Sequence, residues 1–316
     1  MLDTLLTGTS NKPESSLRIA ILIPCYNESK TLYSVIQDCK THLPEATVYV
    51  YDNGSSDNSI EIAKASGAKV KNVLLRGKGQ VVRRMFADIE AAIYVMVDGD
   101  ATYDIAKAKD AIALLNAQSL DMVVCTRKPQ DKYSFPPGHA LGNKLFSYAV
   151  NILFGRQFTD IFSGFRIFSK RFVKSFPAIS QGFEIETEMT IHSLQLSLPC
   201  DEIESKYQER PQGSSSKLHT FKDGYRILRT ILLLFIYVRP MSLFGLLFLF
   251  FSLIGLCFGL PLTIDFIHTG LVPKIPTVIL TAIFCVLAGL SLVCGVILDS
   301  VSRSRLEIKR LWYLRS

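Results

Sequence analysis

The 316-residue sequence predicts an α/β protein with a doubly wound, mostly parallel sheet, followed by two membrane-spanning helices. Up to about residue 126, short apolar runs alternate with segments of helical spacing. Such alternation is typical of parallel sheets covered by helices. Hydrophobic residues make up 48% of the chain, and their excess lies after about residue 227. The chain therefore divides into a domain without spans and an apolar C-terminal part.

Five short runs rich in Val and Ile are expected to form the strands. They are residues 19–24, 47–51, 69–75, 93–97 and 122–125. Continuous apolar runs of this length suit strands that are buried on both faces. Helices are expected between them, at 31–40, 57–65, 80–90 and 105–116. Ligands of such sheets bind at the carboxyl ends of the strands, where polar clusters fall in this sequence.

The segment that follows the fifth run is expected to be less regular. Residues 127–145 are rich in Pro, Lys and Gly and predict a long loop, of the kind that often closes over substrates. Helices are expected at 140–154 and 184–196, and an extended segment at 201–208. At the other end, residues 1–17 are polar and lack the apolar core of a signal peptide, so they are expected to be a flexible terminus.

Two long uncharged segments predict a transmembrane hairpin. Residues 240–264 and 275–298 contain no Asp, Glu, Lys or Arg, and each can cross ~30 Å of hydrocarbon. Lys and Arg flank the outer ends of both segments, whereas the short connecting loop has only Lys274. This asymmetry predicts that the α/β domain and both termini lie in the cytoplasm, with the hairpin in the inner membrane.

The boundaries of the domains follow from these segments. The α/β domain is expected at 18–221 and a basic cytoplasmic tail at 299–316. Residues 222–239 mix apolar residues with Arg226 and Arg229, which predicts an amphipathic helix in the membrane interface. The alternative is that this segment extends the first span.

Composition limits the class of partner. The formal charge is +7, which suits anionic lipid or a phosphorylated substrate. No zinc finger, RNA-binding signature or DNA-reading basic helix is visible, so no nucleic-acid partner is expected. The seven cysteines include no CxxC pair, so neither a disulfide framework nor a zinc site is expected.

The clearest chemical motif is Asp98-Gly99-Asp100, directly after the fourth run. Residues two apart in an extended backbone point the same way, so both carboxylates can approach one hard cation. Mg²⁺ or Mn²⁺ bound there would leave coordination places for diphosphate oxygens and neutralise a departing diphosphate.

Two further motifs end the first and second runs. Tyr26 and Glu28, in Pro24-Cys25-Tyr26-Asn27-Glu28, are candidates to contact a nucleotide base, although an ordinary turn with helix caps is the alternative. Asp52, which opens the sequence Asp-Asn-Gly-Ser-Ser-Asp, is a candidate for binding base or ribose. Asp57 at its end is expected to cap the next helix.

The order of these motifs resembles family 2 glycosyltransferases of the GT-A fold. Residues 159–166 (TDIFSGFR) and 209–218 (ERPQGSSSKL) look like the dolichol-phosphate mannosyltransferases and their bacterial polyprenyl-phosphate relatives. The resemblance covers about residues 18–225, and the paired spans match members with a membrane hairpin. It implies a GT-A-like fold, a nucleotide-sugar donor and a polyprenyl-phosphate acceptor.

The resemblance also implies a donor site. The residues that match the nucleotide pocket are Pro24, Tyr26, Glu28 and Asp52. Those that match the metal and diphosphate site are Asp98, Gly99 and Asp100. The remaining donor-side matches are Arg127, Arg210 and Lys217, the last two as a basic pair that closes over the diphosphate. Thr102 stands where the mannosyl enzymes tend to have Gln, which weakens the inference to mannose.

Lys78 is a candidate for binding donor phosphate or sugar. It lies in Arg76-Gly77-Lys78-Gly79, after the third run, where the glycines permit close approach of the backbone. A solvated basic turn is the alternative.

The acceptor site is implied by the same resemblance. Arg166 and Ser169 match the acceptor-phosphate site, and Asp160 is a candidate to orient the acceptor or to act as a base. Asp160 can equally be a turn residue. Glu184 or Glu186 is an alternative catalytic carboxylate, although acidic residues are ordinary at a helix N-terminus. The site must bind the two phosphates of the donor and the one phosphate of the lipid. Arg and Lys are therefore expected beside the Asp pair, because they bind phosphate anions.

These roles imply the inverting transfer of a hexose or N-acetylhexosamine, with a UDP-sugar as the first choice of donor. The product would be a lipid-linked sugar for glycan assembly. The alternatives are a GDP-mannose-dependent polyprenyl-phosphate mannosyltransferase, a polysaccharide-building family 2 enzyme and a non-enzymatic membrane scaffold. A homo-oligomer is compatible with the resemblance, because hairpin-anchored relatives can be oligomeric.

Overall fold

The computed structural model describes most of the chain. The described residues are 18–129, 146–148, 150–151, 158–208, 228–229, 232–233, 235–272 and 274–315. The predicted N-terminal segment, most of the predicted 127–145 loop and 140–154 helix, and both Arg210 and Lys217 lie outside these residues.

Seven strands form one mixed sheet in the order β3-β2-β1-β4-β6-β5-β7. The strands are β1 (Ile19–Cys25), β2 (Thr47–Asp52), β3 (Lys69–Asn72), β4 (Ile93–Met96), β5 (Met122–Pro129), β6 (Arg166–Ser169) and β7 (Cys200–Tyr207). All five predicted strands are present, and β7 matches the extended segment expected at 201–208. β6 was not predicted as a strand, and it runs antiparallel to both of its neighbours, β4 and β5.

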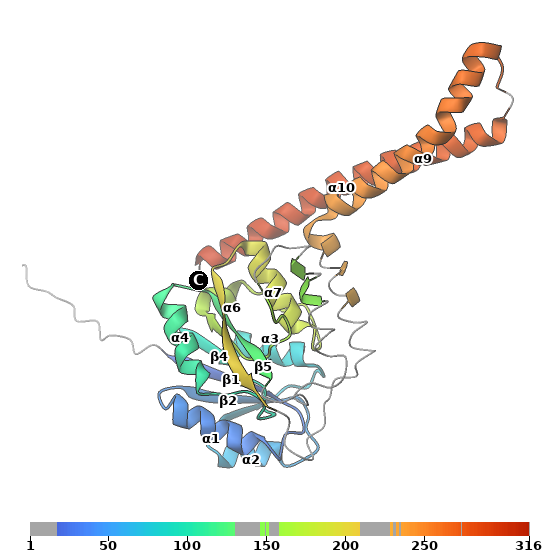
Figure 1. Cartoon of the computed structure of the whole chain (residues 1–316). Coiled ribbons are helices and arrows are strands. Elements are labelled where there is room, and N and C mark those ends of the chain that lie inside the picture. The colour runs from blue at the N-terminus through green and yellow to red at the C-terminus, as the bar shows by residue number, and fades with distance from the viewer. Residues whose placement is uncertain are drawn as a thin grey trace, which may run out of the picture.

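Helices cover both faces of the sheet (Figure 1). One face packs on α1 (Leu32–His42), α2 (Ser59–Ala65) and α4 (Lys107–Ala117). The other face packs on α3 (Lys78–Asp88), α6 (Lys170–Ser175) and α7 (Ile185–Leu196). Because side chains alternate along a strand, Ile21 of β1 joins the first core and Leu22 joins the second. The predicted doubly wound, mostly parallel α/β architecture is therefore confirmed.

The strand order determines where a ligand can bind. The chain moves from β1 outward through β2 to β3, then returns to β4 on the other side of β1. This reversal is a topological switch point, and the loops after β1 and β4 separate there to leave a crevice. The Tyr26 and Asp98 motifs follow these two strands.

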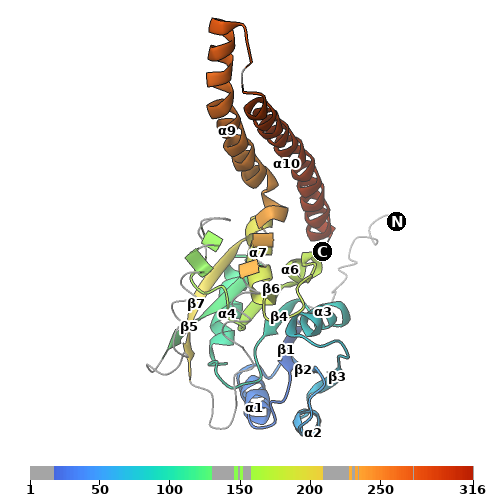
Figure 2. The ribbon, with the colours of Figure 1, turned by 90° about the vertical axis from the view of Figure 1, so that its right-hand side faces the viewer.

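Two long helices extend away from the sheet domain as a hairpin (Figures 1 and 2). α9 spans Pro240–Thr269 and α10 spans Ile275–Arg315. Only 6% and 17% of their most apolar windows are buried, so neither is the core helix of a soluble domain. Both are long and apolar enough to cross a membrane.

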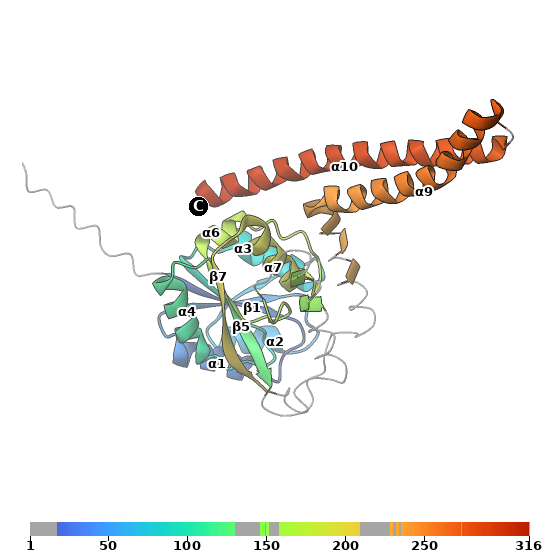
Figure 3. The ribbon, with the colours of Figure 1, turned by 45° about the horizontal axis from the view of Figure 1, so that its top comes forward.

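The predicted basic tail is part of a helix that packs against the sheet domain. α10 continues without a break through residues 299–315, and its C-terminal end lies beside α6 (Figure 3). The Tyr313 hydroxyl donates to buried Asp121 over 2.7 Å, and the Arg171 guanidinium lies 5.3 Å from the centre of the Tyr313 ring. Lys309 Nζ donates to Gln195 of α7 over 2.8 Å. The C-terminal end of α10 is thus attached to α6 and α7.

Candidate functional site

A cavity of about 310 Å³ lies at the switch point between β1 and β4. Its walls come from the β1–α1 turn, the turn after β4, and the start of α3. The predicted site residues that line it are Pro24, Tyr26, Glu28, Lys78, Asp98, Gly99 and Asp100. The fold therefore gathers residues from three separate motifs around one space.

The turn after β4 holds Asp98 and Asp100 through local contacts. The Thr31 hydroxyl of the β1–α1 turn donates to the Gly99 carbonyl over 2.6 Å. Asp100 is 3% exposed, and its Oδ1 accepts hydrogen bonds from the amide and hydroxyl of Thr102. The Asp98 carboxylate lies against Gly164, where a built Cβ would come within 2.3 Å of Asp98 Oδ2. Gly164 thus leaves the space that Asp98 occupies.

Lys78 connects Asp98 to a second carboxylate. Its Nζ lies 2.5 Å from Asp98 Oδ1 and 2.6 Å from Glu186 Oε1. Burial lowers the pKa of Lys78, but the two carboxylates outweigh it and raise the pKa above the ordinary value. Burial raises the pKa of Glu186, and Lys78 offsets this only in part. Lys78 is therefore a buried cation between two acids, and the alternative of a solvated basic turn is wrong.

The first two polar turns are joined to each other. Asn27 adopts a positive φ of 53°, and its side chain accepts a hydrogen bond from the Ser56 amide over 2.7 Å. Asp57 accepts from the Ser29 and Ser59 amides, close to its expected role as a cap of α2. At the mouth of the cavity, the Arg76 guanidinium lies 4.9 Å from the centre of the Tyr26 ring. These contacts place one aromatic ring and one cation at the opening.

Asp52 does not line the cavity, and its carboxylate holds the turn that follows β2. It is 1% exposed, and its carboxylate accepts hydrogen bonds from the amides of Gly54 and Ser55. Its neighbour Asn53 lines the cavity instead. Asn53 Oδ1 accepts from the Gly77 amide and its Nδ2 donates to the Leu75 carbonyl. A direct contact of Asp52 with a ligand, as the family pattern implies, would require this turn to open.

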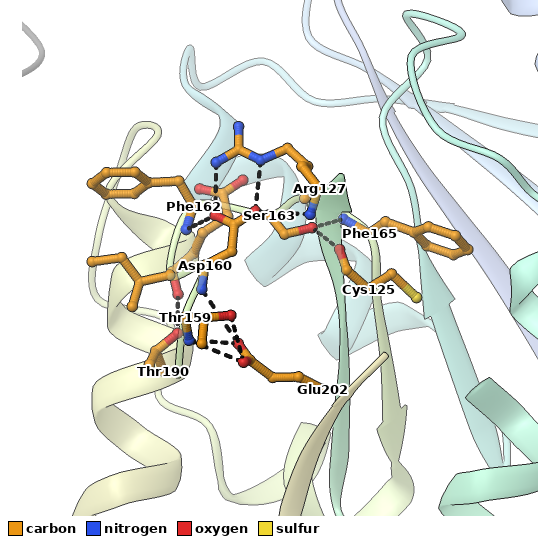
Figure 4. Close-up of polar contacts among 12 residues, drawn as sticks. Cys125, Arg127, Thr159, Asp160, Phe162, Ser163, Phe165, Thr190 and Glu202 are labelled. Atoms are coloured by element: carbon orange, nitrogen blue, oxygen red, sulfur yellow. Dashed lines mark hydrogen bonds and ion pairs between the residues drawn. The ribbon is translucent and has the colours of Figure 1, made fainter. Parts of the chain in front are cut away.

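Arg127 and Asp160 form a buried ion pair beside β5 (Figure 4). Arg127 donates through Nε and Nη2 to the two carboxylate oxygens of Asp160, each over 2.7 Å. Burial raises the pKa of Asp160, but the Arg127 charge and the hydrogen bonds lower it below the ordinary value. Neither residue is among the described residues that line the cavity. In this geometry Asp160 is an ionised anchor for Arg127 and the following turn.

Arg166 is fully buried, so in this structure it does not present its charge to an acceptor phosphate. Its guanidinium donates to the carbonyls of Ser163 and Ile161 and to the Thr190 hydroxyl of α7. It therefore positions the turn that carries Asp160 and Gly164.

Ser169 lies at the opposite edge of the sheet from the cavity. It pairs with Ile93 at the start of β4, whereas Arg166 pairs with Met96 at its end. Its hydroxyl caps α6 by accepting from the Phe172 amide and donates to Asp121. The structure thus does not bring Ser169 to the site, which differs from the expectation of an acceptor contact.

The Arg127–Asp160 pair predicts a pH-dependent effect on stability. A carboxylate with a lowered folded pKa stabilises the protein above its unfolded pKa of about 3.9, and this contribution is lost as pH falls through the folded pKa. Asp160→Asn leaves buried Arg127 without its anion, so it should lower the free energy of unfolding at pH 7 by about 3 kcal/mol. The difference from wild type should shrink below about pH 4. Urea unfolding followed by circular dichroism from pH 7 to pH 3 measures it.

The matched control is Glu204→Gln, because Lys128 and Glu204 form an exposed ion pair nearby. An exposed pair contributes about 0–1 kcal/mol, so this variant should resemble wild type at every pH. An equal loss in both variants would contradict a special role for the buried pair.

Asn53 and Phe183 are among the cavity-lining residues that were not singled out from the sequence. Asn53 lies inside a motif that was otherwise interpreted, so its position after β2 was an available signal. Phe183 precedes α7 in a stretch without a motif, and its ring centre lies 6.0 Å from Lys78 Nζ. Only the folded chain brings it to the site.

The carboxylates at the cavity suit a cation that shares its ligands with a substrate. Asp98 and Asp100 supply hard oxygen donors on one wall. Among the described residues, no group of three or more His, Cys, Asp or Glu side chains could hold a metal ion alone. Mg²⁺ in phosphate-transfer sites typically uses one or two carboxylates with waters and substrate phosphates, so this donor set fits such an ion.

Comparison with known sequences identifies relatives of the domain. The model of "Glycosyl transferase family 2" matches residues 20–176. The chain is 34% identical to glycosyltransferase AglJ of Haloferax volcanii, over 65% of this chain and 68% of that protein. It is 27% identical to a Methanococcus voltae protein named UDP-N-acetylglucosamine–dolichyl-phosphate N-acetylglucosaminyltransferase, over 66% of this chain and 94% of that protein.

A solved structure shares the fold. Glucosyl-3-phosphoglycerate synthase of Mycobacterium tuberculosis, determined with Mn²⁺ and UDP-glucose, superposes with a TM-score of 0.56 at 21% identity. The match covers 70% of this chain and 79% of that one. It supports a GT-A-like fold for the sheet domain.

Proposed function

We propose that this chain, which belongs to glycosyl transferase family 2, transfers a hexose or N-acetylhexosamine from a UDP-sugar to a polyprenyl phosphate. The observation that carries the proposal is the cavity at the β1–β4 switch point. It combines an aromatic ring, a pair of acids and two cations in a protein that also has a hairpin suited to a membrane.

The donor fits the chemistry of the cavity walls. Tyr26, at the mouth, offers a ring face to a nucleotide base, and Arg76 and Lys78 offer positive charge to its diphosphate. A divalent cation held by Asp98 and Asp100 would neutralise the charge that develops on the departing nucleoside diphosphate. The names of the relatives support this choice, since one uses UDP-N-acetylglucosamine and a structural neighbour binds UDP-glucose with Mn²⁺.

The acceptor is proposed to approach from the side of the hairpin. A second cavity of about 490 Å³ adjoins the first and shares Arg76 and Gly77 with it. Its outer wall includes Arg229, Leu233 and Tyr237, which precede α9. Apolar and cationic side chains next to the start of a membrane span suit a phosphate on a lipid chain.

The transfer itself needs little proton movement on the acceptor side. One oxygen of the lipid phosphate attacks the anomeric carbon, and the bond from that carbon to the diphosphate oxygen breaks with inversion. The acceptor oxygen is already anionic, so no general base is required. The role of this chain is then to align the two substrates and to stabilise the departing charge.

The sequence and the helix lengths together support a location in the inner membrane. α9 and α10 would span the inner membrane, with the hairpin turn around Lys274 outside and the sheet domain in the cytoplasm. The excess of Lys and Arg beside the outer ends of the hairpin supports this orientation.

A donor screen tests the proposal. Purified full-length protein in vesicles that contain polyprenyl phosphate is given labelled UDP-glucose, UDP-N-acetylglucosamine or GDP-mannose with Mg²⁺ or Mn²⁺. Label from a UDP-sugar should enter the organic-extractable fraction and depend on the lipid phosphate. Transfer from GDP-mannose alone would favour the mannosyltransferase alternative, and label on a water-soluble glycan would favour a polysaccharide-building enzyme.

A further inference from the structure

We propose that Glu186 is a positioning residue that draws the Lys78 ammonium away from Asp98 and so makes the Asp98 carboxylate available to a divalent cation. The proposal rests on the proposed function in one respect only, the binding of a cation by Asp98. It assigns a role in cation binding to the ion-paired trio Lys78, Asp98 and Glu186.

Lys78 competes for the carboxylate that the cation needs. Its Nζ is 2.5 Å from Asp98 Oδ1, and the Lys78 side chain is only 11% exposed. A divalent cation on the same carboxylate would lie within a few ångströms of the ammonium, in a site where charge repulsion is weakly screened. The cation can therefore bind strongly only if the ammonium moves or shares its charge with another anion.

Glu186 is placed to accept the ammonium. It is not among the residues that line the cavity, and its Oε1 lies 2.6 Å from Lys78 Nζ. Its second oxygen, Oε2, is buried and accepts no hydrogen bond from the residues that the structure describes. An ammonium has three donors, so Lys78 can leave Asp98 and bond both oxygens of Glu186. This exchange keeps the buried charge paired, which avoids the large cost of an isolated one.

The backbone around the pair is closely packed and hydrogen-bonded, so we expect the exchange to involve the side chains alone. A Cβ on Gly77 or Gly79 would come within 2.1 Å of the carbonyls of Gln181 and Ser180. The Gly79 amide also donates to the Gln181 carbonyl over 3.0 Å. Since Ser180 is bonded to Glu188 of α7, the start of α3 and the start of α7 form one unit. Lys78 and Glu186 therefore stay within reach of each other.

The proposal predicts effects of opposite sign on metal affinity. Mn²⁺ alone is titrated into detergent-solubilised full-length protein, and free Mn²⁺ is read by electron paramagnetic resonance. Lys78→Met removes the competitor and should tighten Mn²⁺ binding about tenfold, the scale of one charge-assisted hydrogen bond. Glu186→Gln leaves the ammonium with Asp98 as its main anion and should weaken binding about tenfold. A purely structural salt bridge predicts that both variants weaken binding.

The double variant Lys78→Met/Glu186→Gln is the control for folding, because it leaves no member of the pair buried and unpaired. It should bind Mn²⁺ more tightly than Glu186→Gln alone. Weaker binding in both single variants, or no change in either, would overturn the proposal. Asp98→Asn tests the cation site itself. Equal Mn²⁺ affinity in wild type and Asp98→Asn would refute the binding of a cation by Asp98, which is part of the proposed function.

Discussion

Asp98→Asn is expected to lower the rate of sugar transfer to the lipid at least about a hundredfold. Asp98 is the acid of the switch-point cavity that contacts both Lys78 and the surface of Gly164. Asn keeps the size of the side chain but removes the charge that would hold a divalent cation beside the diphosphate. Asp100→Asn should have a similar effect. The initial rate of label entering the lipid extract measures both.

The matched control is Asp110→Asn. Asp110 lies on α4 and forms an exposed ion pair with Lys107, so its loss should leave transfer unchanged. Thermal unfolding is measured in parallel because Asp100 is buried and bonded to Thr102. Asp98 and Asp110 variants with equal rates would show that the acids after β4 do not serve the reaction.

Much of the fold could be predicted because most strands appear in the sequence as short, continuous apolar runs. The runs that became β1, β2 and β4 are buried on both faces, so hydrophobicity alone reveals them. β6 escaped prediction because it is only four residues long and begins with Arg166. An arginine inside a sheet core is acceptable only where carbonyls are arranged to receive it, and the sequence does not show that arrangement.

The motifs of the site could be predicted from the sequence, but the hydrogen-bond and ion-pair partners of their side chains could not. The Tyr26 and Asp98 turns follow strands, so their place at the edge of the sheet could be inferred. The partner of Lys78 on α7 could not be inferred, because α3 and α7 are far apart in the sequence and come together only in the folded sheet domain. Asp52 matches a ligand-binding position by pattern, yet its carboxylate is occupied by its own turn. A motif indicates which residues are available, whereas hydrogen bonding decides which of them face the ligand.

Gly164→Ala is expected to separate activity from stability. A Cβ at this position would lie 2.3 Å from Asp98 Oδ2 and 2.9 Å from Asp98 Cγ, closer than real contacts allow. These are atoms of a short side chain that can rotate, so the fold should survive with little loss of stability. The carboxylate, however, must move by roughly 1 Å, and a misplacement of this size can cost a reaction about a hundredfold. We therefore expect transfer to fall between about tenfold and a hundredfold while the unfolding temperature stays close to that of wild type.

Two other glycines make the comparison specific. At Gly289 of α10, a Cβ would have no atom within 4 Å apart from the local helix backbone, so Gly289→Ala should leave the rate unchanged and should not lower the stability. Gly77 has a φ of 123° and a backbone carbonyl 2.1 Å from the built Cβ, so Gly77→Ala should lower both. Of the three variants, Gly164→Ala alone should lower the rate while leaving the stability nearly unchanged, because the three atoms nearest to the added Cβ all belong to the Asp98 carboxyl group. An unchanged rate in Gly164→Ala would mean that the position of this carboxylate does not limit the transfer.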